Sequence, residues 1–232
     1  MNRIGIIGAM DEEVDILVDL MDIKETVEKA SLKFYKGTIE QKEVVLVRCG
    51  IGKVNSALCA QILISEFHVD AVVNTGVAGA LDLELDVYDI VISTDAIQYD
   101  FDTTVFGNKK GEIPRMETST FKADERLINA AYESSIEEVK THKVLKGRVV
   151  TGDMFISSKE LKDELVSEFS AYCGEMEGAA IAHVCSLNKV PFVIIRAMSD
   201  KADGSADVAY EEFVVDAAHN SKEIVLNMLK TI

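Results

Sequence analysis

Short runs rich in Val and Ile alternate with longer segments of helical periodicity along the chain. Near-continuous apolar runs of this length are typical of strands buried on both faces, and such strands are usually joined by helices. The alternation therefore predicts an α/β fold in which a twisted, mixed but mostly parallel central sheet is flanked by helices. The expected strands are Arg3–Ile7, Phe34–Ile39, Glu43–Arg48, Ala71–Asn74, Ile90–Ile97, Val144–Val150 and Phe192–Ala197.

Apolar residues three and four positions apart predict the helices between these strands. Segments 11–22 and 210–229 show this spacing, and a third helix is expected at 178–187. A length of 232 residues suits one large α/β domain, and the chain has no internal repeat, low-complexity stretch or linker. Residues 1–232 are therefore predicted to form a single domain.

The charge balance excludes several classes of partner. The chain carries 40 acidic and 24 basic residues, a formal net charge of −16. Nucleic acid or an anionic membrane surface would be repelled, so neither is expected as a partner. The apolar run Ile4–Met10 is far too short to span a bilayer, and the acidic residues that follow it at once are unlike a signal peptide. We expect a cytoplasmic protein.

Metal and cofactor motifs are not found. The four cysteines and four histidines are scattered and include no C-x-x-C pair, so no metal site is predicted. The stretch Gly5–Gly8 lacks the G-x-G-x-x-G order of dinucleotide sites, and Gly50–Lys53 is followed by Val54 where a P-loop needs Ser or Thr. No cofactor is therefore predicted.

Polar residues gather where the predicted strands end. Ligands of open α/β sheets bind beyond the carboxyl ends of the strands, so the residues that follow each strand should converge there. These positions contain carboxylates, glycines and apolar side chains but little positive charge, in segments 8–13, 75–80, 151–156, 174–177 and 198–200. Such a lining suits a neutral, polyhydroxylated ligand with a flat apolar part, and a nucleoside fits that description.

Three carboxylates in these segments stand out, although each has an ordinary structural explanation. Glu13 and Glu177 lie at the start of predicted helices, where acidic side chains complement the helix dipole. Asp200 follows a strand, where Asp often forms a turn or a cap. Their common position at strand ends favours a functional site.

Several segments, taken in order, resemble those of the 5′-methylthioadenosine/S-adenosylhomocysteine nucleosidases. The G-A-M-x-E-E opening, the E-M-E triplet and the closing S-D are together very specific, and the resemblance spans essentially the whole chain. The matching segments are Ile4–Glu13, Gly50–Lys53, Asn74–Gly76, Gly152–Ile156, Glu175–Glu177 and Arg196–Asp200.

This resemblance implies a nucleoside phosphorylase-like fold, a homodimer without metal, and hydrolysis of the bond between adenine and a 5′-thio-substituted ribose, as in methionine salvage. By position, Glu13 matches the general base, Asp200 the general acid that protonates adenine at N7, and Glu177 the residue that binds the ribose hydroxyls. Other matches to substrate-binding residues are Met10, Ile51, Val77, Gly79, Phe155, Ile156, Met176, Ser199 and Phe213.

The irregular stretch 99–121, which contains Gly107, Gly111 and Pro114, is expected to leave the sheet as a long excursion. Phe106 and Pro114 within it match residues that reach the neighbouring subunit's site. One position departs from the family's pattern, since Val77 stands where Ser is usual. A lost hydrogen bond to ligand costs about 0.5–1.5 kcal/mol, so weaker binding is expected without a change of reaction.

Two other functions remain as alternatives. A nucleoside phosphorylase on the same fold would need basic residues to hold phosphate, whereas the loop after the first strand reads Asp11-Glu12-Glu13. A nucleoside-binding module without turnover would have no need of an acid and a base together. The sequence does not rank 5′-methylthioadenosine, S-adenosylhomocysteine and 5′-deoxyadenosine as substrates.

Overall fold

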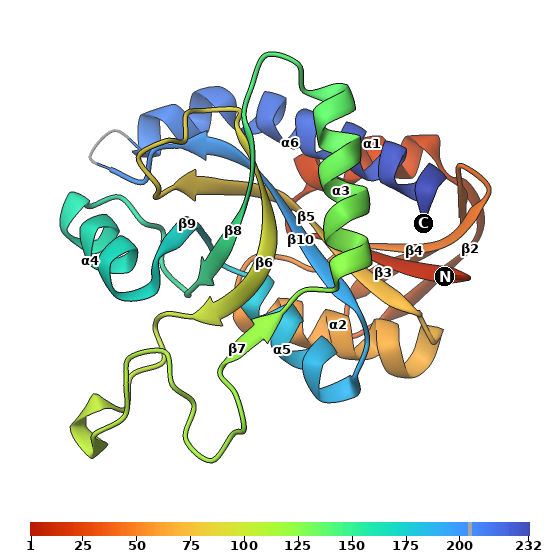
Figure 1. Ribbon diagram of the computed structural model, residues 1–232. Coiled ribbons are helices and arrows are strands. Elements are labelled where there is room, and N and C mark those ends of the chain that lie inside the picture. Colours follow the sequence, from red (N-terminus) through yellow and green to blue (C-terminus); the bar gives the residue numbers. More distant parts are fainter. Residues whose placement is uncertain (204–205) are drawn as a thin grey trace.

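The computed structural model describes residues 1–203 and 206–232, which form one α/β domain (Figure 1). Its strands are β1 (Arg3–Gly8), β2 (Asp22–Lys29), β3 (Leu32–Ile39), β4 (Lys42–Arg48), β5 (Ala71–Ala80), β6 (Ile90–Gln98), β7 (Thr120–Lys122), β8 (Val144–Thr151), β9 (Ala171–Glu175) and β10 (Phe192–Asp200). Its helices are α1 (Asp11–Leu20), α2 (Lys53–Phe67), α3 (Glu125–Glu138), α4 (Lys159–Phe169), α5 (Gly178–Asn188) and α6 (Ala206–Thr231), with a short 3-10 helix, η1, at Thr104–Phe106.

The strands form one mixed sheet, as the alternation of apolar runs predicts. Its order is β10-β6-β8-β9-β5-β1-β4-β3-β2, with β7 paired to β6. A further pairing of β10 with β5 closes β5, β9, β8, β6 and β10 into a ring. Strands β1, β4, β5 and β10 run parallel, so their carboxyl ends meet at one edge.

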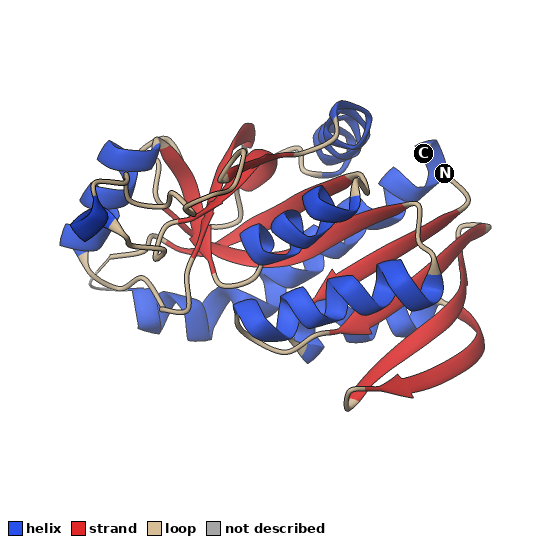
Figure 2. Cartoon of the chain, turned by 90° about the horizontal axis from the view of Figure 1, so that it is seen from below, coloured by secondary structure: helices blue, strands red, loops and turns tan. Residues whose placement is uncertain are grey.

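Helices cover both faces of this sheet. On one side α6 contacts β5, β10, α1 and α3, and on the other α2 packs against α5. Figure 1 shows α1 and α6 above the strands and α2 and α5 below them, and Figure 2 shows the helices from below. The main core is built from the fully buried apolar side chains of the central strands, such as Ile6, Leu46 and Val73.

Two strands continue three or more residues beyond their predicted ends, and the difference concerns the expected site. The strand predicted to end at Asn74 continues to Ala80, and the strand predicted to end at Ala197 continues to Asp200. Glycine and polar residues suggested loops, but these segments pair with each other in parallel, with a register shift between Met198 and Asp200. The proposed acid therefore lies at the end of a strand and not on a loop.

Three strands were not predicted. Strand β2 is mostly exposed and polar, because it lies at the sheet's edge beside β3, so it lacks an apolar run. Its start at Asp22 also explains why the helix predicted at 11–22 ends at Leu20. Strands β7 and β9 have only three and five residues, too few for a clear periodicity.

The segment between β6 and β7 leaves the body of the molecule, as predicted for residues 99–121. Figure 1 shows it projecting away from the sheet with η1 near its tip. Val105 and Phe106 on η1 are 85% and 81% exposed. Within the described ranges, no helix is long and apolar enough to cross a membrane.

The ring of strands depends on a close approach between β8 and β9. A Cβ atom on Gly147 would lie 2.5 Å from Cδ1 of the Tyr172 ring and nearer still to Cγ. We expect Gly147→Ala to lower the free energy of unfolding by about 1–3 kcal/mol, because overpacking forces neighbours to move. Urea unfolding measures this loss, and adding Tyr172→Ala should relieve part of it. Wild-type stability in Gly147→Ala would contradict the packing described.

Candidate active site

A cavity of about 360 Å³ opens at the edge where the carboxyl ends of β1, β5 and β10 meet. This volume lies within the range of small-molecule sites. The walls come from the turn into α1, the loop before α2, the ends of β5, β9 and β10, the loop before α4, the turn into α5 and the helix α6. They consist of Ala9, Met10, Glu13, Ile51, Val77, Ala78, Gly79, Phe155, Gly174, Glu175, Met176, Glu177, Ser199, Asp200 and Tyr210.

Most of the residues singled out in the sequence meet at this cavity. Its lining includes Met10, Glu13, Ile51, Val77, Gly79, Phe155, Met176, Glu177, Ser199 and Asp200. Ile156 lines a small adjoining hollow, together with Phe155, Met176 and Asp200 among others. The convergence expected from positions after strands therefore brings the three carboxylates to one site.

Three of the selected residues lie elsewhere. Phe213 is not part of the lining, and its ring packs edge-on against Tyr88 with the centroids 5.6 Å apart. Tyr210, three residues earlier on α6, faces the cavity in its place and packs edge-on against Phe155. Phe106 and Pro114 are exposed on the excursion, away from this chain's own cavity.

Glu13 is held by backbone groups of two elements. Its Oε2 accepts hydrogen bonds from the N–H groups of Ala9 (2.6 Å) and Met10 (3.1 Å), and its Oε1 accepts one from Val77 N–H (3.1 Å). Burial raises the pKa of Glu13, although the Arg196 charge and these hydrogen bonds act against the rise. Because Val77 contacts Glu13 through its backbone, this bond does not depend on having Ser at that position.

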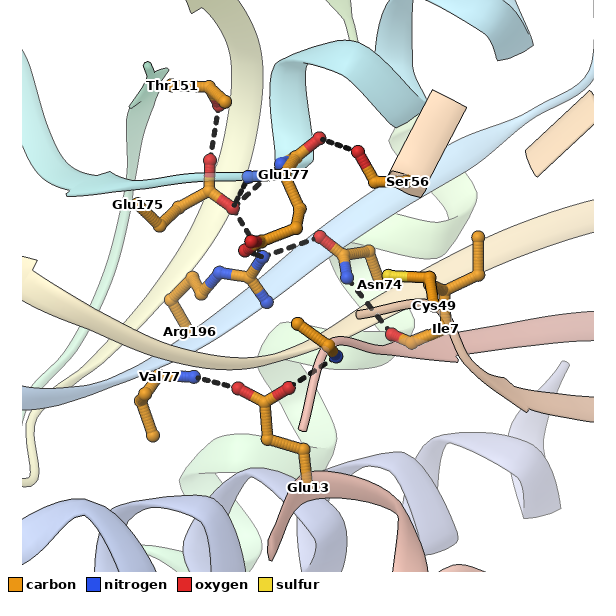
Figure 3. Close-up of polar contacts among 12 residues, drawn as sticks. Ile7, Glu13, Cys49, Ser56, Asn74, Val77, Thr151, Glu175, Glu177 and Arg196 are labelled. Carbon is orange, nitrogen blue, oxygen red and sulfur yellow. Dashed lines mark hydrogen bonds and ion pairs between the residues drawn. The ribbon is translucent and has the colours of Figure 1, made fainter. Parts of the chain in front are cut away.

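Arg196 is the centre of a buried polar network that the sequence analysis did not single out (Figure 3). Its Nη2 donates to Asn74 Oδ1 at 2.7 Å and to Glu175 Oε2, and it lies 3.9 Å from Glu177 Oε2. Burial acts to lower the pKa of Arg196, but the charges of Glu175, Glu13 and Glu177 outweigh it and raise the pKa. An arginine inside an apolar strand was the available signal, since a fully buried guanidinium needs anionic partners.

Two donors of Arg196 remain unpaired within the part of the chain that is described. They are Nε and Nη1, both buried. The glycine opposite Arg196 on β5, Gly76, leaves room here, because a Cβ atom on it would lie 2.7 Å from Nη1 and closer still to Glu13 Oε1. The base candidate and free donors of a cation therefore face the same small space.

Glu175 connects this network to α5. Its carboxylate accepts hydrogen bonds from the hydroxyl of Thr151 and from the N–H groups of Glu177 (3.1 Å) and Gly178 (2.7 Å). These bonds satisfy the first turn of α5, whose N-cap, Glu177, makes no side-chain cap of its own. The side chain of Glu177 is consequently free to face the cavity.

Glu177 is less firmly paired than Glu175. Its Oε1 accepts one hydrogen bond, from Gly52 N–H at 2.8 Å. Burial and the neighbouring charge of Glu175 raise the pKa of Glu177 to about 8, against the opposing effect of Arg196. This carboxyl is therefore able to gain from hydroxyl donors on a ligand.

Asp200 lies on the bulged end of β10 and lines the same cavity. Its Oδ1 accepts a hydrogen bond from Ala202 N–H (2.8 Å), and its Oδ2 accepts one from the Ser199 hydroxyl (2.9 Å). Burial raises the pKa of Asp200, with both hydrogen bonds acting against the rise. A carboxyl with a raised pKa is better suited to donating a proton near neutral pH.

The lining offers little to a metal ion or an anion. No group of three or more His, Cys, Asp or Glu side chains that could hold a metal occurs among the described residues. The cavity walls, so far as they are described, contain no Lys or Arg. Arg196 lies behind them, in contact with Glu175.

Comparison with known proteins gives one consistent result. The model of the phosphorylase superfamily matches residues 3–230. The 5′-methylthioadenosine/S-adenosylhomocysteine nucleosidase of Staphylococcus carnosus is 45% identical over 99% of this chain and 100% of its own. That of Treponema pallidum is 39% identical over 99% of this chain and 93% of its own.

Solved structures agree with these sequence relatives. The nucleosidase of Neisseria meningitidis, in complex with methylthio-immucillin-A, superposes with a TM-score of 0.95, at 38% identity and full coverage of both chains. The futalosine hydrolase of Helicobacter pylori superposes with a TM-score of 0.94, at 34% identity over 100% of this chain and 98% of its own. The chain belongs to the phosphorylase superfamily and, within it, to the 5′-methylthioadenosine/S-adenosylhomocysteine nucleosidases.

Proposed function

We propose that this protein hydrolyses the N-glycosidic bond of 5′-methylthioadenosine and S-adenosylhomocysteine, releasing adenine and the 5′-thioribose. The observation that carries the proposal is one cavity that brings together two buried carboxyls, Glu13 beside the unpaired donors of Arg196 and Asp200 beside Ser199. Cleavage of a ribosyl bond builds positive charge on the sugar and negative charge on the base. An acid and a base that line one cavity meet both needs.

Each carboxyl then has a separate task. Asp200 donates a proton toward N7 of the departing adenine, helped by a pKa that burial raises. Glu13 removes a proton from the attacking water, and the unpaired donors of Arg196 help to hold that water. Glu177 accepts hydrogen bonds from the ribose hydroxyls, and in its ionised form it offsets the growing positive charge of the sugar.

Water is favoured over phosphate as the nucleophile. A phosphorylase needs cations beside the ribose, whereas the space beside Arg196 is shared with the carboxylate of Glu13. Negative charge at that point repels phosphate and suits the activation of water. The apolar side chains of Met10, Ile51 and Phe155 provide surfaces for the flat base and the thioether.

We also propose that the protein acts as a homodimer in which residues 99–121 reach the neighbouring site. The exposed apolar side chains of Val105 and Phe106 support this, since they gain from burial against a partner. Ile51 and Phe155 at the cavity are likewise 54% and 42% exposed, so the mouth has apolar surface left to cover. Light scattering that gives the mass of a single chain would contradict the dimer.

The site leaves the 5′ substituent open. Adenine nucleosides with methylthio, homocysteinyl or hydrogen at this position all satisfy the proposed roles of the carboxyls, so 5′-deoxyadenosine is a further candidate substrate.

All four cysteines are buried and unpaired, which supports a reducing compartment such as the cytoplasm.

Loss of either the acid or the base should abolish most turnover. We expect Asp200→Asn and Glu13→Gln each to lower kcat by about 10²–10⁴ or more, the usual scale for one acid–base group, with the melting temperature close to that of the wild type. Adenine release from 5′-methylthioadenosine in phosphate-free buffer measures the effect. Normal turnover in either variant would refute its assigned role.

The ionised side chain of Glu177 should lower the stability of the fold while contributing to substrate binding. Its pKa of about 8 lies above that of an unfolded chain, so its ionisation destabilises the fold increasingly as the pH rises toward 8. Glu177→Gln should therefore melt above the wild type by a margin that grows from about pH 5 to about pH 8, while kcat/KM falls about tenfold or more. Thermal melts at several pH values check the first effect. A margin that stays constant with pH would show that the ionisation of Glu177 is not destabilising.

A further inference from the structure

The motif Gly50–Lys53 includes Ile51, which lines the cavity, but the proposed reaction gives its other residues no role. Lys53, the first residue of α2, is part of a closed set of polar contacts between three separate segments. Its Nζ donates to Asp100 Oδ1 (2.6 Å), its backbone N–H donates to Asp153 Oδ1 (2.8 Å), and Asp153 N–H donates to Asp100 Oδ2 (3.1 Å). We call Lys53, Asp100 and Asp153 the clasp.

The ion pair between Lys53 and Asp100 is more enclosed than an ordinary surface pair, whereas Asp153 is exposed. The side chains of Lys53 and Asp100 are only 19% and 24% exposed. A lysine in the first turn also opposes the helix dipole, so helix stability alone does not favour it there. Since the N-cap of α2 is Gly52, which has no side chain to serve as a cap, Asp153 supplies the carboxylate that the N-terminus of the helix needs.

The next residue back from Lys53 makes the contact that matters for the site. Gly52 N–H donates to Glu177 Oε1 at 2.8 Å. Gly52 has φ +99°, which favours glycine, and a Cβ atom on it would lie 3.1 Å from Asp153 Oδ1. Two successive backbone N–H groups therefore point at two carboxylates, one in the clasp and one in the cavity.

The clasp also fixes two walls of the cavity. Ile51 lies two residues before Lys53, and Phe155 lies two residues after Asp153, so the three contacts set the distance between these apolar side chains. Asp100 lies at the start of the excursion, immediately after β6 and Tyr99.

We propose that Lys53, Asp100 and Asp153 are positioning residues, which hold Gly52 N–H against Glu177 and so orient its carboxylate toward the ribose hydroxyls. This inference rests on the proposed role of Glu177. It adds three residues to the reaction that neither donate protons nor contact the substrate. Their effect should therefore be largest for substrates that carry the hydroxyls.

The test compares 5′-methylthioadenosine with its 2′-deoxy and 3′-deoxy counterparts. In the wild type, kcat/KM should be higher for the ribonucleoside than for at least one deoxy compound. Lys53→Met, which keeps the aliphatic stem, and Asp100→Asn, which keeps the shape, should each reduce this preference about tenfold or more, because small misplacements of a binding group are costly. Lys53→Arg should keep much of the preference. The double variant, Lys53→Met with Asp100→Asn, should lose little more of the preference than either single variant.

Lys29→Met is the matched control. Lys29 forms an ion pair with Glu66, near the opposite end of the same helix, so its loss should leave the preference unchanged. If Lys53→Met and Asp100→Asn lower kcat/KM equally for all three substrates, the residues have a general structural role and the proposal is overturned. The proposal is also overturned if both variants have wild-type kcat/KM for all three substrates. If the wild type itself shows no preference for the hydroxyls, the role of Glu177 fails together with the clasp. If the wild type prefers the hydroxyl-bearing substrate and both variants keep that preference, only the proposed role of the clasp is contradicted.

Discussion

The burial of Arg196 among three glutamates is the interaction on which the rest of the site depends. Three carboxylates in one enclosed region would repel each other and lose their hydration, a cost that a fold avoids unless a cation and hydrogen bonds compensate. Arg196 supplies that cation, and it contacts Glu175 directly. The Thr151 hydroxyl and the backbone N–H groups in the first turn of α5 donate further hydrogen bonds to the carboxylate oxygens of Glu175.

This arrangement divides the carboxylates by how completely they are paired. Glu175 is committed to structure, because it binds the guanidinium and the helix end together. Glu13 and Glu177 face the same cation from a greater distance and keep the raised pKa values that burial gives them. A chain that fixes one carboxylate firmly can thus hold two others nearby in a reactive or ligand-binding state.

Much of this could be predicted from the sequence, because strand ends in a parallel sheet converge. The α/β fold, the excursion and the meeting of Glu13, Glu177 and Asp200 follow from apolar runs and from the residues after them. Pairings between distant segments could not be predicted, and they include the closure of β10 onto β5. Phe213, which the resemblance assigned to the pocket, is not part of the lining, whereas Tyr210, three residues earlier on the same helix, is.

The division between water and phosphate is the most direct consequence of placing carboxylates around Arg196. It can be measured by incubating the wild-type protein with 5′-methylthioadenosine at increasing phosphate concentrations and identifying the sugar product by mass spectrometry. We expect equal amounts of adenine and free 5-methylthioribose, formed at a rate that does not depend on phosphate. A sugar 1-phosphate, or adenine release that requires phosphate, would contradict this expectation.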